Sequence, residues 1–561
     1  MKSRKDFFQT INSFPHSLAI YCTFTLDKEV IDKIAESSSY SNIIILHDYR
    51  QGVSLKNNWD NRVVCIPVST PSQHQQNCFH SKLALLKGND KAKLLLGSAN
   101  LSKDSFSKEK EICFEVELEF SSDFYNHIVS YIESLIPQTY TSTEVLTTAI
   151  NKLRYSNQKL KRQTELSLVH PTITDSISDS LRKHIHQEEQ PILRITSPYL
   201  SADYRSDLGA FIEEVNPKEI HLFLRKNYPI PSELRTFQEL KLFQPKPRNI
   251  RNGFHAKLLS VEYSSKEIVF IGSANFSRQG FFLDLQHGAN QECGVIISSK
   301  DKHIVDDWFN EGWEKPVALD DWQEDEKLLE VNEEEFHIEP YAWAERKNSD
   351  NVSLLFFIPE GNLVHKVSVG GRKIRVEPKF VERNIFQFSC ILKGESILIE
   401  IGDLYKEEIT IFNECAFEAK ANENGEGLFL TSAGIDSTNP LELQDAINRE
   451  GIKLKTSAGV IVEPPFLEQY FYNVKNKLAK LETRKFFSDF HAQELQKVLS
   501  EEISGGAGMY YASQLLKCFE KKEQYNLADM CRTRIQGLLS KEDGLINYQS
   551  FGAFYKTWKK Y

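Results

Sequence analysis

Two copies of one pattern decide how this chain is organised. The first is Phe79-His80-Ser81-Lys82, followed by Gly97-Ser98-Ala99-Asn100. The second is Phe254-His255-Ala256-Lys257, followed by Gly272-Ser273-Ala274-Asn275, and in both copies the glycine lies fifteen positions after the lysine. Because the spacing is identical, we expect a duplicated unit whose two halves meet at one site.

The residue types indicate what such a site can do. His-x-Lys in a strand places both side chains on one face. The apolar runs Leu83–Leu86 and Lys93–Leu96, and likewise Leu258–Val261 and Ile268–Ile271, predict a β-hairpin in each copy that ends in Gly-Ser-Ala-Asn. Two such hairpins facing each other would supply imidazoles, ammonium groups, hydroxyls and amides. That set binds a phosphate anion and offers a nucleophile and an acid for displacement at phosphorus.

The paired motifs resemble the signature of the phospholipase D superfamily over residues 15–315. The aspartate that the family carries five residues after the lysine is replaced by Lys87 and by Glu262. Tyrosyl-DNA phosphodiesterases and some restriction-type nucleases of that superfamily lack it too, so the departure favours a nucleic-acid enzyme over a lipid hydrolase. The resemblance and the repeated pattern together predict these catalytic and phosphate-binding residues: His80, Lys82, Asn100, His255, Lys257 and Asn275, with Ser98 and Ser273 on the phosphate.

Glu111 and Glu292 are expected to orient the histidines. A nucleophilic imidazole must be neutral and held in one tautomer, which a carboxylate on its other nitrogen achieves. Both glutamates stand at the start of predicted strands, Ile112–Leu118 and Cys293–Ile297, and the alternative is that they are solvated strand-edge acids. The resemblance assigns attack to His80 and proton transfer to His255, and we expect Glu292 to lie beside His255.

The predicted fold class is α/β, with duplicated phospholipase D-like lobes of mixed sheets flanked by helices. Alternating strand and helix patterns place lobe 1 at 1–141 and lobe 2 at 191–316. The remaining ranges are a helical connector at 142–190, an acidic linker at 317–350, a β-sandwich or barrel at 351–420 and a mainly helical domain at 421–561.

Composition narrows the functional class. With 561 residues, 40% hydrophobic and 26% charged, the chain can bury several cores. No apolar run reaches the roughly 18–20 residues that span a bilayer, and nine cysteines without a Cys-x-x-Cys pair favour reduced thiols in a cytoplasmic protein. The sequence also lacks a phosphate-binding Gly-x-x-x-x-Gly-Lys-Ser/Thr loop, a His-Glu-x-x-His motif and a carboxylate cluster. We therefore expect no metal and no cofactor, and a separate helicase or ATPase subunit as the partner class.

Charge points to the substrate. The net charge of −10 argues against indiscriminate binding to polyanions, so a nucleic-acid site must be a local basic groove. The stretch before His255 supplies such a surface through Lys241, Lys246, Arg248 and Arg251. A solvated loop is the alternative interpretation.

The sequence thus predicts a metal-independent phosphodiesterase, a nuclease that acts through a phosphohistidine, with DNA favoured over RNA. One chain carries both motifs, so the active site should form within one protomer, and any oligomer would use the C-terminal domain. A hydrolase of phospholipids or phosphodiester-linked adducts is the enzymatic alternative. A non-catalytic nucleic-acid-binding scaffold in a defence or repair complex is the alternative from another class. Whether the nucleic acid is single- or double-stranded, the cleavage polarity and the sequence preference stay open.

Overall fold

The computed structural model describes most of the chain between residues 5 and 413. The described ranges are 5–38, 41–56, 62–70, 77–88, 91–107, 111–154, 165–186, 189–200, 207–237, 239–246, 255–325, 339–346, 351–359, 361–380 and 383–413. The chain divides into two units, Met1–Asn413 and Glu414–Tyr561, and all described residues belong to the first. The helical domain predicted for 421–561 lies outside the described residues.

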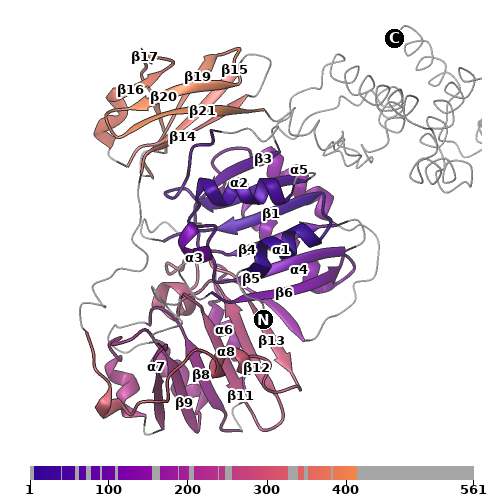
Figure 1. The fold of residues 1–561 in the computed structure, drawn as a ribbon, viewed down its shortest axis with the longest axis vertical. Helices are drawn as coiled ribbons and strands as arrows, with labels where there is room; N and C mark the ends of the chain where they lie inside the picture. The colour runs from indigo at the N-terminus through magenta and orange to yellow at the C-terminus, as the bar shows by residue number, and fades with distance from the viewer. Residues whose placement is uncertain are drawn as a thin grey trace, which may run out of the picture. The chain divides into compact units, whose positions relative to one another are not determined.

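The first lobe is a six-stranded sheet in the order β3-β2-β1-β4-β5-β6 (Figure 1). Strands β1 to β3 are parallel neighbours, and β4 to β6 continue the sheet in antiparallel fashion. β1, β2 and β3 are buried along their whole length, which is typical of strands covered on both faces. Figure 1 shows α1 and α2 side by side over one face of this sheet. The elements are α1 (Lys5–Ser13), β1 (Leu18–Thr23), α2 (Lys28–Ser37), β2 (Asn42–Asp48), β3 (Val63–Val68), β4 (Leu83–Lys87), β5 (Lys91–Gly97), α3 (Lys103–Ser107), β6 (Cys113–Glu119), α4 (Asp123–Ser134), η2 (Ile136–Gln138) and α5 (Thr143–Leu153).

The second lobe repeats this plan. Its sheet has the order β10-β9-β8-β11-β12-β13-β7, and its first six strands match the first lobe in order and in direction. The duplication therefore covers the whole lobe and not only the motif. The elements are β7 (Leu166–Val169), α6 (Ile177–Arg182), β8 (Ile192–Thr196), α7 (Asp207–Val215), β9 (Glu219–Phe223), η3 (Ser232–Thr236), β10 (Leu240–Phe243), β11 (Leu258–Glu262), β12 (Glu267–Gly272), η4 (Arg278–Phe282), β13 (Gly294–Ser299), α8 (Asp306–Asn310) and η5 (Leu319–Asp321).

The segment predicted as a helical connector, 142–190, is only partly helical. It contains α5 and α6, but between them β7 pairs antiparallel with β13 as the seventh strand of the second sheet. Leu166, Leu168 and Val169 could be taken for one face of a helix. The edge of β13 offers backbone groups that need partners, and residues 166–169 form a strand because they pair with that edge.

The third sheet has eight strands in the order β17-β16-β20-β21-β14-β15-β19-β18. Its elements are β14 (Tyr341–Arg346), β15 (Asn351–Phe357), η6 (Gly361–Lys366), β16 (Val367–Val369), β17 (Arg372–Lys373), β18 (Glu377–Phe380), β19 (Ile385–Ile391), β20 (Ser396–Ile401) and β21 (Tyr405–Asn413). The edge strands β17 and β18 are joined by residues 374–376 alone, a connection that reaches at most about 14 Å. The sheet therefore curls around one core, which is closer to the predicted barrel than to a sandwich of two sheets.

One strand of this sheet was assigned wrongly from the sequence. β14 lies inside 317–350, the range predicted as an acidic linker. Ala342 and Ala344 face the core of the third sheet, while Tyr341 packs on the other side against the first lobe. Its hydroxyl donates to the carbonyl of Tyr49 at 2.9 Å, and its ring fills the space over Gly52. Because β14 is buried on both faces, its sequence lacks the alternation of polar and apolar residues by which a half-exposed strand is recognised.

No helix in the described part of the chain has the length and apolar character needed to cross a bilayer.

Candidate active site at the seam between the lobes

Backbone hydrogen bonds join the two lobes beside the first motif. The amide of His80 donates to the carbonyl of Gln291 at 3.0 Å, and the amide of Gln291 donates to the carbonyl of Cys78 at 2.9 Å. A strand-like bridge between Phe79 and Gln291 results. The segment that carries His80 is therefore held directly against the segment that carries Glu292.

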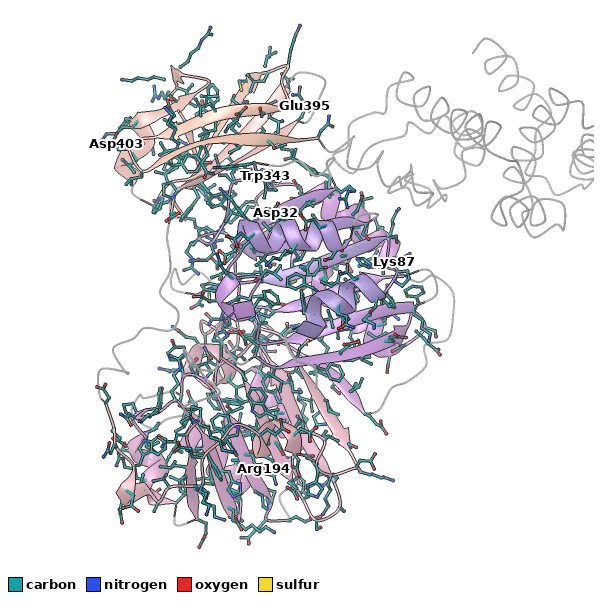
Figure 2. All side chains as sticks on the ribbon, in the orientation of Figure 1. Asp32, Lys87, Arg194, Trp343, Glu395 and Asp403 are labelled. Atoms are coloured by element: carbon teal, nitrogen blue, oxygen red, sulfur yellow. The ribbon has the colours of Figure 1, made fainter. Side chains whose placement is uncertain are left out.

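The motifs lie just before the hairpins and not inside their first strands. Lys82 precedes β4 and Lys257 precedes β11, and neither lysine belongs to a strand. The hairpins β4–β5 and β11–β12 are antiparallel, as predicted. Lys87, labelled in Figure 2, ends β4 at the opposite end from His80.

His80 is held by a carboxylate from the other lobe. Its Nδ1 lies 2.7 Å from Oε1 and 2.8 Å from Oε2 of Glu292. Both side chains are buried, with 3% of His80 and none of Glu292 exposed. Because an ionised carboxylate only accepts hydrogen bonds, Nδ1 must carry the proton, and Nε2 is left as the reactive nitrogen.

His255 shows the reciprocal pairing. Its Nδ1 lies 3.1 Å from Oε1 of Glu111, which belongs to the first lobe. The expectation that Glu292 lies beside His255 is therefore wrong: each glutamate crosses the seam and orients the histidine of the other lobe. The physical reason is that β5 packs against β12 and β13, so the strand ends of each lobe face the motif of its partner.

The two motif serines support the glutamates. Ser98 donates its hydroxyl proton to Oε2 of Glu111, and Ser273 donates to Oε2 of Glu292. Each hydroxyl oxygen also accepts a backbone amide at 3.0 Å, from Ile112 in the first lobe and from Cys293 in the second. Both serines are completely buried. Because these hydroxyls donate to the carboxylates, Ser98 and Ser273 hold Glu111 and Glu292 in place. This supporting role replaces the phosphate-binding role predicted for the two serines.

The motif glycines are required by a neighbouring strand and not by a ligand. A Cβ on Gly97 would lie 2.0 Å from the carbonyl oxygen of Ile112, and one on Gly272 would lie 2.7 Å from that of Cys293. Ile112 and Cys293 are also the residues whose amides donate to Ser98 and Ser273. Glycine therefore allows the close approach that brings each serine to its glutamate.

The two lysines are buried beside their histidines. Lys82 donates to the carbonyl of His80 at 3.1 Å, and Lys257 donates to the carbonyl of His255 at 2.9 Å. Nζ of Lys257 also lies 2.6 Å from Nε2 of His255. At most 1% of either lysine is exposed, and a buried ammonium is costly unless an anion compensates it.

The two asparagines contain unsatisfied amide oxygens. Oδ1 of Asn100 and Oδ1 of Asn275 are buried and have no hydrogen-bond partner within the described structure. Buried polar atoms are nearly always bonded in folded proteins, so a symmetric pair of exceptions indicates groups reserved for a ligand or for a group that moves during turnover.

Electrostatics keep both glutamates ionised. Burial opposes the charge of Glu111, but His255, Lys257 and Ser98 outweigh it and lower the pKa of that carboxyl to about 2. Burial likewise opposes the charge of Glu292, and His80 leads the groups that lower its pKa below the usual value. Both residues are therefore anionic hydrogen-bond acceptors at neutral pH.

Asp48 and Arg50 support the first motif, and neither was predicted from the sequence. Oδ2 of Asp48, at the end of β2, accepts the backbone amide of Phe79 at 2.8 Å. Arg50 binds Asp48 through Nε at 2.9 Å and donates to the carbonyl of Asn77 at 3.1 Å. The signal was a pair of charged residues, Asp48 and Arg50, at the carboxyl end of a buried strand, where ligands bind in parallel sheets.

The basic stretch before His255 is only partly described. Lys241 lies on β10, the edge strand of the second sheet, and Glu219 holds its Nζ at 2.6 Å. Lys246 is exposed. Arg248 and Arg251 lie outside the described residues, so their contribution to a nucleic-acid surface stays a prediction.

Glu262, which stands where the family carries its aspartate, binds Arg194 at 2.6 Å; Arg194 is labelled in Figure 2. Among the residues that the structure describes, no three His, Cys, Asp or Glu side chains are grouped as metal ligands.

Comparison with protein-family models and with curated proteins found no match. Solved structures with a similar fold include yeast tyrosyl-DNA phosphodiesterase, with 14% identity and a TM-score of 0.38 over 54% of this chain and 88% of that chain. Phosphatidylserine synthase from Haemophilus influenzae Rd KW20 has 13% identity and a TM-score of 0.40 over 59% of this chain and 86% of its own. NucT from Helicobacter pylori has 17% identity and a TM-score of 0.19 over 26% and 93%.

The strand order is repeated in both lobes, and the two His-x-Lys segments meet at one seam. In fold, the chain is a duplicated α/β protein, as the two motifs predicted.

Proposed function

We propose that this protein is a metal-independent phosphodiesterase, and specifically a nuclease that cleaves DNA. The observation that carries the proposal is the reciprocal pairing of two buried histidines with two buried glutamates across the seam. Each pairing holds the proton of an imidazole on Nδ1 and leaves the chemistry to Nε2, which is the arrangement that nucleophilic and acid–base catalysis need.

The proposed reaction has two steps. Nε2 of His80 attacks phosphorus, a phosphorus–nitrogen bond forms, and the bond from phosphorus to the leaving oxygen breaks. Protonated His255 donates its Nε2 proton to that oxygen. In the second step His255 takes a proton from water, the water oxygen bonds to phosphorus, and the phosphorus–nitrogen bond to His80 breaks.

The other residues of the seam serve the phosphate. Lys82 and Lys257 supply positive charge for the non-bridging oxygens, where charge develops in the transition state. Asn100 and Asn275 have amide oxygens that lack a partner in the described structure. These oxygens can accept a hydrogen bond from the attacking water, and the NH₂ groups can donate to the phosphate. Glu111 and Glu292 act through the histidines, because they contact imidazoles and serines.

Nucleic acid is the proposed substrate class because the usual motif aspartates are replaced by Lys87 and Glu262 and because basic residues precede His255 in the sequence. The test is incubation of the pure protein with labelled DNA, labelled RNA, a phospholipid and a small chromogenic phosphodiester, each with and without chelator. Cleavage of DNA in chelator supports the proposal. Turnover of the phospholipid alone would favour the lipid alternative, and the absence of any turnover would favour a non-catalytic scaffold.

A further inference from the structure

A cationic segment of the third sheet has no role in the seam. Between Arg372 and Arg383 the sequence contains five basic residues and two acidic ones. It begins with β17, an edge strand, and continues through β18 at the other edge. We refer to it as the 372–383 segment.

Three of its basic side chains are available to an external anion. Arg372, Lys373 and Arg375 are exposed, and none of them forms an ion pair with a carboxylate of the described ranges. Lys406 on β21 is different, because Glu400 holds its Nζ at 2.5 Å. Arg372, Lys373 and Arg375 thus present positive charge to the solvent in a protein whose net charge is −10.

The end of the segment is anchored on the first lobe. Nζ of Lys379 donates to the carbonyl of Tyr140 at 3.0 Å, and Arg383 donates to the hydroxyl of the same tyrosine. The guanidinium of Arg383 also lies 5.9 Å from the ring centre of Tyr49, and Phe380 packs on Tyr140 with 4.9 Å between ring centres. Cation–π and ring contacts of this kind hold the segment against the end of β2.

That end of β2 is also the support of the first motif. Asp48, the neighbour of Tyr49, accepts the amide of Phe79, and Phe79 directly precedes His80. The anchored segment and the candidate catalytic histidine are therefore fixed to the same edge of the first sheet.

We propose that the 372–383 segment is a second nucleic-acid contact surface. It binds backbone phosphates of the substrate that lie beyond the phosphate that is cleaved. The inference rests on the proposed function for its substrate class. Cationic side chains on an exposed edge strand contact phosphates without reading sequence, so the segment contributes affinity and placement. It gives the third sheet a role in holding long substrates.

The test uses the full chain with Arg372→Glu, Lys373→Glu and Arg375→Glu combined. Binding to a long labelled oligonucleotide is measured by fluorescence anisotropy over a series of salt concentrations, in a His80→Ala background that prevents cleavage. We expect affinity to fall by about tenfold or more, and the slope of log K against log salt to decrease in magnitude by about 2. Turnover of the small chromogenic phosphodiester, measured with His80 intact, should stay at its wild-type value.

The control combines Lys33→Glu, Lys218→Glu and Lys300→Glu, which affect exposed residues far apart in the sequence and change the net charge equally. Unchanged oligonucleotide affinity in the first variant, or an equal loss in the control, would overturn the inference. If the wild-type protein hydrolyses no phosphodiester, the proposed function fails, while the binding comparison still decides whether the segment contacts nucleic acid.

Discussion

Replacing the two crossing glutamates separately should stop the reaction at different steps. Glu292→Gln leaves an amide opposite Nδ1 of His80, at contacts of 2.7 and 2.8 Å. When the amide presents its NH₂ group, Nδ1 must accept, and the imidazole proton moves to Nε2. That tautomer cannot attack phosphorus, so the first step slows.

The magnitude follows from the burial and length of these contacts. A wrong tautomer in a carboxylate–histidine pair costs up to about 10⁴ in kcat, or roughly 5 kcal/mol of barrier. Glu292 is fully buried, so we expect its replacement to cost about 10³ to 10⁴. Glu111→Gln should cost less, about 10² to 10³, because its contact with His255 is longer, at 3.1 Å, and Glu111 is partly exposed.

The assay is rapid quenching with substrate labelled at the scissile phosphate, followed by peptide mapping of the acid-labile adduct. In Glu111→Gln, phosphorus should accumulate on His80, because His255 no longer activates water efficiently. In Glu292→Gln no adduct should accumulate. Accumulation in Glu292→Gln but not in Glu111→Gln would refute the crossed roles. Glu262→Gln is the matched control, since Glu262 binds Arg194, and it should keep nearly the full rate.

Four further outcomes are expected. Cleavage should persist in EDTA, and an absolute requirement for added magnesium would contradict the mechanism. Mixing His80→Ala protein with His255→Ala protein should restore no activity, because the seam forms within one chain; recovery would place the site between protomers. Asn100→Ala and Asn275→Ala should each lower kcat by about 10²-fold with little change in KM if their amides serve the transition state, as steady-state kinetics can show. The lowered pKa of Glu111, about 2 against an ordinary 4.5, stabilises the fold above pH 4.5, and this contribution is lost as the pH falls through about 2. Glu111→Gln should therefore reduce the unfolding free energy by roughly 3 kcal/mol at pH 7 and hardly at all near pH 2, measured by denaturant titration; equal losses at both values would contradict the linkage.

Most of the fold was predictable from local patterns. The hairpins around both motifs form as expected, because continuous apolar runs and a repeated motif are local signals. β7 and β14 were missed because their strand character depends on partners far along the chain, β13 and the first lobe.

For the candidate site, the sequence by itself determined which residue types gather: two His-Lys pairs, two Gly-Ser-x-Asn segments with equal spacing, and two glutamates. It could not determine which glutamate meets which histidine, because that pairing depends on how the lobes face each other and not on any interval along the chain. Tertiary structure alone decided that Glu292 crosses to His80 and Glu111 to His255, and that Ser98 and Ser273 hold carboxylates instead of phosphate. The physical reason is that a symmetric motif leaves both pairings open until the lobes pack, and close contact between their strand ends then permits only one.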